Sequence, residues 1–128
     1  MNTSARVLIV DDSRVLRTHL RIMMQAMGWT CEEAESGISA LDRIAHNPDF
    51  DLLLLDVNMP KMSGMECLRT IHNMANPPRM KVMMVTTESD FPLVTEALTN
   101  GSDEFLMKPF TREILVDKLR LMELPVGL

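Results

Sequence analysis

The stretch Leu-Leu-Leu-Leu-Asp-Val-Asn-Met-Pro, residues 52–60, joins a short apolar run to an abrupt polar stop at Asp56. Four consecutive leucines without polar alternation are typical of a strand covered on both faces, as in a parallel sheet. The same pattern occurs at residues 7–12, where Val-Leu-Ile-Val is followed by Asp11 and Asp12. Both stretches therefore predict central strands that end in carboxylates.

The rest of the chain alternates between short apolar strands and segments with helical periodicity. Further strands are predicted at residues 29–34, 80–85 and 104–107, and helices at about 13–27, 36–47, 63 onward, 92–100 and 111–123. The helix from residue 63 opens with Ser-Gly-Met-Glu, the S-x-x-E form of a capping box. This alternation predicts an α/β fold, a doubly wound, five-stranded parallel sheet with five helices. The strands near residues 29 and 103 are more polar and are expected at the edges.

Length and composition favour one ordinary globular domain over residues 1–128, with a core at about residues 5–123 and no output domain. No apolar run is long enough to span a membrane, so no membrane insertion is expected. The formal net charge of −5 argues against broad binding to nucleic acid, which requires a basic surface. Two cysteines are too few for a disulfide framework, and a cytoplasmic location is expected.

Polar side chains follow four of the predicted strands at the point where each strand ends. Asp11 and Asp12 follow the first strand, Asp56 the third, Thr86 the fourth and Lys108 the fifth. The carboxyl ends of parallel strands share one edge of a sheet, which is where open α/β folds bind ligands. Three carboxylates, one hydroxyl and one ammonium are therefore expected in one site.

Such a site favours a divalent cation and phosphoryl chemistry. Crowded carboxylates repel one another unless a cation intervenes, and hard oxygen ligands suit Mg²⁺. A carboxylate beside such a metal is able to attack phosphorus, while Lys108 and Thr86 stabilise the phosphoryl oxygens. An alternative for the pair Asp11 and Asp12 is that they only cap the first helix.

Taken together, the motifs resemble the signature of response-regulator receiver domains, in particular small stand-alone members of the CheY-like type. The motifs are residues 7–12, 52–60, Val85-Thr86 and Lys108-Pro109, and the resemblance covers essentially the whole chain. It implies a flavodoxin-like sheet with the strand order 2-1-3-4-5. It also implies a phosphorylation-dependent switch of a two-component system or phosphorelay.

The resemblance assigns a role to each site residue. It implies that Asp56 is the phosphoacceptor and that Lys108 pairs with the phosphoryl group, before a cis Lys108-Pro109 peptide bond. It implies Mg²⁺ as the cofactor, held by Asp11, Asp12, Asp56 and the backbone carbonyl of Asn58. As in the family, such a domain is not an enzyme beyond its own phosphorylation and dephosphorylation.

Four residues are assigned to the switch and to its timing. The resemblance implies that Thr86 moves to bond the phosphoryl oxygen and that Phe105 turns inward in response. Asn58 and Glu88, each two residues beyond the acceptor aspartate or the switch threonine, occupy the positions that tune the loss of the phosphoryl group.

The resemblance also implies partners. A histidine kinase or phosphotransfer protein is the expected phosphodonor, and Arg14, Arg17 and Arg21 share a helix face on which it could dock. The alternative for these arginines is a solvated face. Leu93 and Phe105 are expected to help form an adaptable surface for an unidentified downstream target protein. No direct DNA binding is expected.

Two other functions remain open at this point. One is a small Mg²⁺-dependent phosphohydrolase with an aspartate nucleophile, although such enzymes carry a D-x-D pattern after the first strand and a cap domain. The other is a structural receiver that never accepts phosphate, although its usual mark is the loss of the acceptor or of the lysine.

Overall fold

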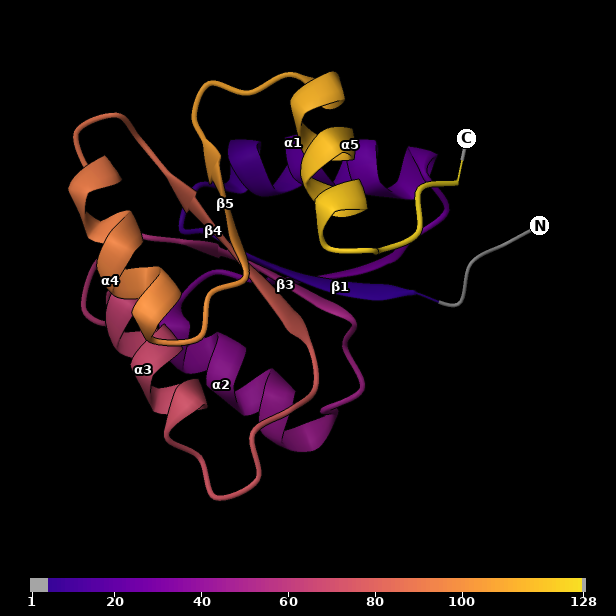
Figure 1. Cartoon of the computed structure of the whole chain (residues 1–128). Helices are drawn as coiled ribbons and strands as arrows, with labels where there is room; N and C mark the ends of the chain where they lie inside the picture. Colours follow the sequence, from indigo (N-terminus) through magenta and orange to yellow (C-terminus); the bar gives the residue numbers. More distant parts are fainter. Residues whose placement is uncertain (1–4, 128) are drawn as a thin grey trace.

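The computed structural model describes residues 5–127 and contains one five-stranded parallel sheet (Figure 1). The strands are β1 (Arg6–Val10), β2 (Thr30–Ala34), β3 (Leu52–Asp56), β4 (Lys81–Thr86) and β5 (Glu104–Met107). Their order is β2-β1-β3-β4-β5, and every neighbouring pair is parallel. The predicted fold class and strand order are confirmed, and the two more polar strands, β2 and β5, lie at the edges as predicted.

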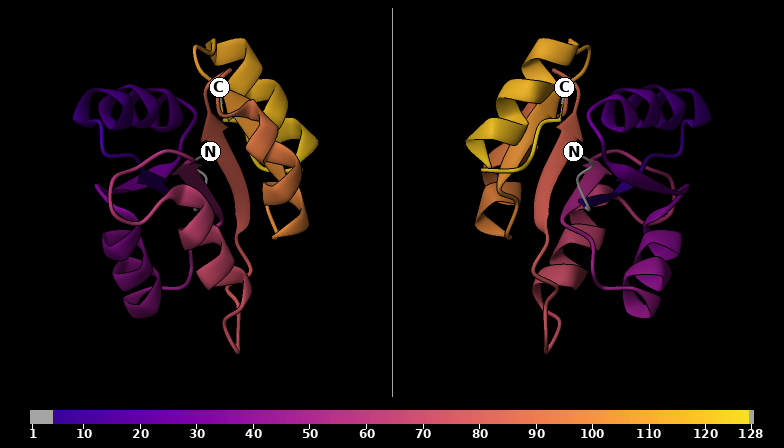
Figure 2. Two further views of the ribbon diagram at one scale, coloured as in Figure 1. Left: turned by 90° about the vertical axis from the view of Figure 1, so that its left-hand side faces the viewer. Right: turned by 90° about the vertical axis from the view of Figure 1, so that its right-hand side faces the viewer.

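Helices cover both faces of the sheet (Figures 1 and 2). They are α1 (Arg14–Ala26), α2 (Gly37–His46), α3 (Gly64–His72), α4 (Val94–Thr99) and α5 (Arg112–Leu121). In the described residues, no helix has the length and apolar character needed to cross a membrane.

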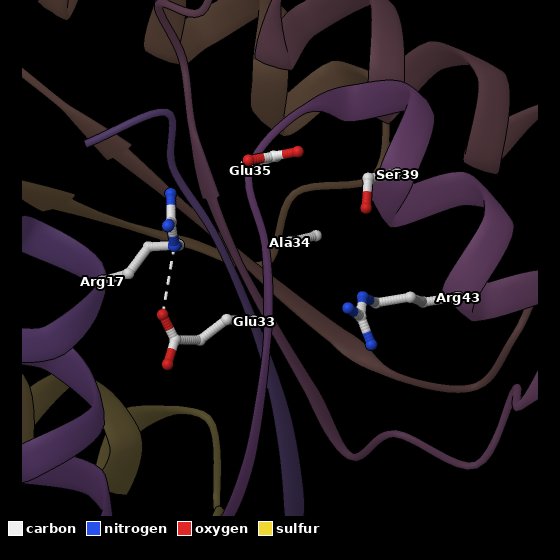
Figure 3. Close-up of a pocket in the computed structure, with 6 residues that line it drawn as sticks. All are labelled: Arg17, Glu33, Ala34, Glu35, Ser39 and Arg43. Atoms are coloured by element: carbon white, nitrogen blue, oxygen red, sulfur yellow. Dashed lines mark hydrogen bonds and ion pairs between the residues drawn. The ribbon is translucent and has the colours of Figure 1, made fainter. Parts of the chain in front are cut away.

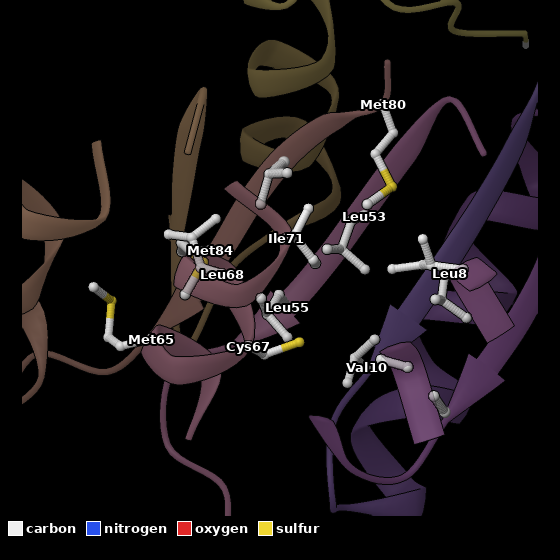
Figure 4. Close-up of a cluster of buried hydrophobic side chains, with 14 of the residues drawn as sticks. Leu8, Val10, Leu53, Leu55, Met65, Cys67, Leu68, Ile71, Met80 and Met84 are labelled. Carbon is white, nitrogen blue, oxygen red and sulfur yellow. The ribbon is translucent and has the colours of Figure 1, made fainter. Parts of the chain in front are cut away.

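Alternate side chains of each strand point to opposite faces, which divides the core into two layers. Leu8, Val10, Leu53 and Leu55 pack against α2, α3 and α4 (Figure 4). The residues that alternate with them on the same strands, Val7, Ile9, Leu52 and Leu54, pack against α1 and α5. All four leucines of β3 are fully buried. A strand buried on both faces needs an unbroken apolar run, which is why residues 52–55 carry no polar residue.

Short polar side chains begin most of the helices. Ser13, Ser36, Ser63 and Thr111 each accept a hydrogen bond from the backbone N–H three residues further on. Ser63 and Glu66 form the reciprocal capping box that was predicted for α3.

The fourth predicted helix differs from the structure at its start. Residues Phe91–Leu93 form a 3₁₀ turn, and the α-helix proper begins at Val94. No side chain caps this end, and Pro92 in the first turn has no N–H to donate. The predicted start at about residue 92 was therefore wrong in helix type, although the end at Asn100 before Gly101 is confirmed.

Helix α3 begins in direct contact with the backbone of Asp56. A Cβ atom placed on Gly64 would lie 2.0 Å from the Asp56 carbonyl oxygen, far inside the contact distance. The Gly64 amide donates to the carbonyl oxygen of Val57, which closes the turn. The strand end that carries Asp56 and the start of α3 are thus fixed against one another.

We expect Gly64→Ala to lower the free energy of unfolding by about 1–3 kcal/mol, because the added methyl group meets backbone that is unable to move aside. Gly37→Ala is the matched control: Gly37 also opens a helix and is buried, but the nearest atoms to its Cβ would be those of the flexible Met62 side chain, with the sulfur at 2.8 Å. Urea unfolding followed by circular dichroism measures both. Equal losses in the two variants would contradict the close approach.

Candidate functional site

The five polar residues predicted to converge do lie together at the carboxyl edge of the sheet. Asp11 directly follows β1, Asp56 ends β3, Thr86 ends β4 and Lys108 directly follows β5. Asp11, Asp56 and Thr86 are buried, and Asp12 is exposed. The neighbouring registers Val10–Leu55 and Asp56–Val85 bring these strand ends level with one another.

The centre of the site is an acidic cluster bridged by one ammonium group. One carboxylate oxygen from each of Asp11, Asp12 and Asp56 lies within 4.8 Å of the others. The Lys108 Nζ donates to Asp56 Oδ1 at 3.1 Å and to Asp11 Oδ2 at 3.3 Å. The peptide bond after Lys108 is cis, as the resemblance implied.

Burial and crowding perturb the proton affinities of this cluster. Burial, and then the charge of Asp11, raises the pKa of Asp56 to about 6, although Lys108 and a backbone hydrogen bond from Asn58 oppose the rise. Burial lowers the pKa of Lys108, but the carboxylates of Asp56 and Asp11 outweigh it and leave that pKa raised. Lys108 is therefore a fixed cation that only partly offsets the negative charge.

The residues present fit a hard divalent cation. Carboxylate oxygens from three residues are the ligand type that Mg²⁺ takes in proteins, with waters and substrate oxygens completing its shell. An acidic pocket of this kind is what the resemblance to receiver domains implied for Mg²⁺. The alternative that Asp11 and Asp12 only cap α1 is wrong, because Ser13 is the capping residue and Asp11 Oδ1 instead accepts from the Ser13 amide at 2.8 Å.

The two predicted switch residues are held by contacts outside the acidic cluster. The Thr86 hydroxyl donates to the backbone oxygen of Thr87 at 3.1 Å. The Phe105 ring is half-buried and meets the Phe91 ring edge to face, with centroids 5.4 Å apart. The Lys118 ammonium lies 4.0 Å from the centre of the Phe105 ring.

Sequence reasoning missed both partners of Phe105. Phe91 lies in the 3₁₀ turn, just before the helix start predicted at about residue 92, and Lys118 belongs to α5, across from β5. Glu104 orients the lysine, since its Oε1 accepts from Lys118 Nζ and from the Phe105 amide, both at 3.0 Å. Asn58 and Glu88 are exposed, and their tuning role stays a prediction.

The three arginines of α1 have different surroundings. Arg17 pairs with Glu33 of β2 (Figure 3). Arg21 pairs with the same carboxylate, and Arg17 also donates to the backbone oxygen of Asp11 at 2.6 Å. The alternative of a solvated face is therefore wrong for Arg17, whose side chain is 13% exposed, whereas the Arg21 side chain is 38% exposed and still faces solvent in part. Arg14 is exposed, so the docking hypothesis stays a prediction that depends mainly on this residue.

We expect the stability of the metal-free protein to fall with rising pH through the titration of Asp56. The folded protein holds this proton up to pH about 6, whereas the unfolded chain releases it at the ordinary value of 3.8. The stabilisation is therefore complete below pH 4 and is lost as the pH rises through 6. Chemical unfolding of the wild type and of Asp56→Asn between pH 4 and 7 measures it: the wild type should lose stability relative to the variant, and parallel curves would contradict the raised pKa.

Comparison with known proteins places this site in a family. Residues 7–120 match the response regulator receiver domain family. The chemotaxis protein CheY1 of Helicobacter pylori is 30% identical over 118 residues, which cover 91% of this chain and 95% of the relative. A CheY homolog of Campylobacter jejuni is 35% identical over 115 residues, covering 89% of this chain and 88% of the relative. The structure of Vibrio cholerae CheY4 matches with a TM-score of 0.84 at 32% identity, covering 93% of this chain and 98% of that one. The chain therefore belongs to the response regulator receiver domain family, whose members are phosphorylation-dependent switches of two-component signalling.

Proposed function

We propose that Asp56 accepts a phosphoryl group from a histidine kinase or phosphotransfer protein and that the resulting charge changes the surface read by a target protein. The observation that carries this proposal is the Lys108 ammonium, which lies between Asp56 and Asp11 at 3.1 and 3.3 Å. An ammonium in this position is able to exchange a carboxylate oxygen for a phosphoryl oxygen without moving far.

The transfer forms one bond to phosphorus and breaks another. A carboxylate oxygen of Asp56 attacks phosphorus, and the bond from phosphorus to the donor's imidazole nitrogen breaks, leaving the electron pair on that nitrogen. Asp11, Asp12, Asp56 and the Asn58 carbonyl would hold Mg²⁺, which supplies charge neutralisation for the phosphoryl oxygens. Lys108 supplies a further cation at the same oxygens.

A phosphohydrolase is not favoured by the arrangement of these residues. The acidic pair is adjacent in sequence, and the proposed nucleophile ends β3 instead of β1. The acceptor and the lysine are both in place, so nothing marks a receiver that has lost phosphorylation. In this proposal the protein catalyses only its own phosphorylation and dephosphorylation, with Asn58 and Glu88 tuning the second reaction.

The partners are proposed from the family and from the surface. Several relatives are named chemotaxis proteins, so we propose a cytoplasmic chemotaxis pathway as the setting. The exposed Arg14 on α1 is proposed to contact the phosphodonor. The exposed apolar residues Phe91, Leu93 and Leu98, with Phe105, are proposed to meet the target protein, and no DNA contact is part of the proposal.

Incubation with acetyl phosphate and Mg²⁺ should add one phosphoryl group to Asp56, detected by intact-mass spectrometry and by mapping after borohydride reduction of the acyl phosphate. Asp56→Asn should stay unlabelled, and Lys108→Met should be labelled far more slowly because the phosphoryl oxygens lose a cation. Asp49→Asn, an exposed aspartate of the α2–β3 loop, is the control and should be labelled like the wild type. Equal labelling of Asp56→Asn would refute Asp56 as the acceptor.

The contacts of Thr86 and Phe105 describe how the switch is held before phosphorylation. The Thr86 hydroxyl must leave the Thr87 carbonyl before it is free to bond a phosphoryl oxygen. Phe105 must leave the contacts with Phe91 and Lys118 before its ring is able to turn inward. We therefore treat these contacts as stabilising the unswitched state, which makes switching a population shift whose balance they set.

We expect Lys118→Met to tighten the binding of beryllofluoride, a mimic of the phosphoryl group, by about two- to fivefold, which is the weight of one cation–π contact. The reason is reciprocity: a contact that favours the unswitched state must weaken any ligand that favours the switched one. The bound beryllofluoride is quantified by ¹⁹F NMR with Mg²⁺ present.

Arg120→Met is the matched control, because it removes the same charge from α5 without any contact to Phe105 in the described residues. Loss of a distant positive charge alone would weaken the binding of an anion, so the direction of the change separates the two effects. Weaker binding in Lys118→Met, or equal changes in both variants, would contradict a role for Lys118 in holding Phe105.

A further inference from the structure

Asp11 is held at every polar group that it has. Its amide donates to the Ala34 carbonyl, its two carboxylate oxygens accept from the Ser13 amide and from Lys108, and its backbone oxygen accepts from Arg17. Three of these contacts come from the backbone or from the lysine already assigned to the site. The contact with Arg17 is the one that no assigned role explains.

Arg17 crosses from α1 to the acidic loop and to the edge strand. Its Nη1 donates to the Asp11 carbonyl oxygen at 2.6 Å, and its Nε donates to Glu33 Oε1 at 3.1 Å. Only 13% of its side chain is exposed. A guanidinium group carries several donors in a fixed plane, so one side chain is able to satisfy a carbonyl and a carboxylate at the same time. Figure 3 shows Arg17 directed toward Glu33 across the hollow beside β2.

We propose that Arg17 is a positioning residue of the metal site, which fixes the Asp11–Asp12 backbone so that both carboxylates face Asp56. The proposal rests on the function proposed above, and it replaces docking as the role of this residue. Of the three aspartates in the site, Asp12 depends most on Arg17. Within residues 5–127, no hydrogen bond or ion pair fixes the Asp12 side chain, so the backbone that Arg17 holds is what sets the direction of its Cα–Cβ bond, from which the carboxylate reaches the cluster.

Glu33 makes this arrangement compatible with a cation site. A bare guanidinium next to the acidic cluster would repel an incoming divalent cation. Glu33 pairs with Arg17 through one carboxylate oxygen and with Arg21 through the other, so its single negative charge offsets part of the two positive charges on the side away from Asp11. Arg17 therefore provides a strong donor at the Asp11 carbonyl, with its positive charge offset in part by Glu33.

The test compares Mg²⁺ affinity in three variants by isothermal titration calorimetry on the unphosphorylated protein. Arg17→Gln should weaken Mg²⁺ binding about tenfold, as the loss of a residue that orients metal ligands does. Arg17→Lys should recover part of that loss, because an ammonium is able to reach the carbonyl.

Arg21→Gln is the matched control, because it removes the same charge from the same helix and from the same partner, Glu33, without touching Asp11. It should bind Mg²⁺ within about twofold of the wild type. Loss of positive charge alone would strengthen Mg²⁺ binding, so weaker binding in Arg17→Gln has the direction opposite to a charge effect. Urea unfolding of each variant separates a change in the site from a loss of folding.

Each outcome decides the matter. Wild-type affinity in Arg17→Gln, or equal weakening in Arg21→Gln, overturns the positioning role and leaves the proposed function standing. A wild type that binds no Mg²⁺ at millimolar concentration overturns the metal site and the inference with it. If Arg17→Gln does not fold, Arg17→Lys serves instead: it keeps the positive charge but loses the planar set of donors, so Mg²⁺ binding should be weaker than in the wild type, and wild-type affinity overturns the proposal.

Discussion

The Lys108 ammonium group contacts two carboxylates, and this contact organises the site at the carboxyl edge of the sheet. Lys108 comes from beyond β5, at the edge of the sheet, and reaches Asp56 and Asp11, which belong to the two adjacent central strands β3 and β1. Without this cation, two buried carboxylates would face each other in a medium that screens charge poorly. The lysine holds the site together but leaves it acidic, as the raised pKa of Asp56 shows.

The strand order also places the reporter residues. β4 lies between β3 and β5, so Thr86, the last residue of β4, lies between the strands that lead to Asp56 and Lys108. Phe105 lies on β5, three residues before Lys108, and its ring meets groups from the 3₁₀ turn and from α5. A charge placed on Asp56 is therefore one strand away from the residue that would sense it, and two strands away from the surface that would display it.

Local patterns made the sheet and the site predictable, whereas contacts between distant segments did not. The apolar run at residues 52–55 predicts a central strand, because a strand covered on both faces needs such a run. The aspartate directly after the run predicts that a carboxylate stands at the carboxyl end of that strand. The surroundings of Arg17 depend on how α1 lies against the edge strand, and helical periodicity alone could not distinguish pairing with Glu33 from exposure to solvent. Phe91 was missed for the same reason, since nothing local indicates that a 3₁₀ turn would carry it to Phe105.

Charge matching in the site gives the reason for a divalent ion. Asp11, Asp12 and Asp56 contribute three negative charges once Asp56 is ionised, above pH about 6, and Lys108 returns one positive charge, which leaves two negative charges in a site where two of the three carboxylates are buried. Arg17 contacts the Asp11 backbone and none of the three carboxylates, and Glu33 offsets its charge in part, because the same glutamate also pairs with Arg21. Two unmatched negative charges are what one divalent cation would neutralise. A phosphoryl group would bring more negative charge to the same place, so the site is suited to accept it with the cation present and to repel it otherwise.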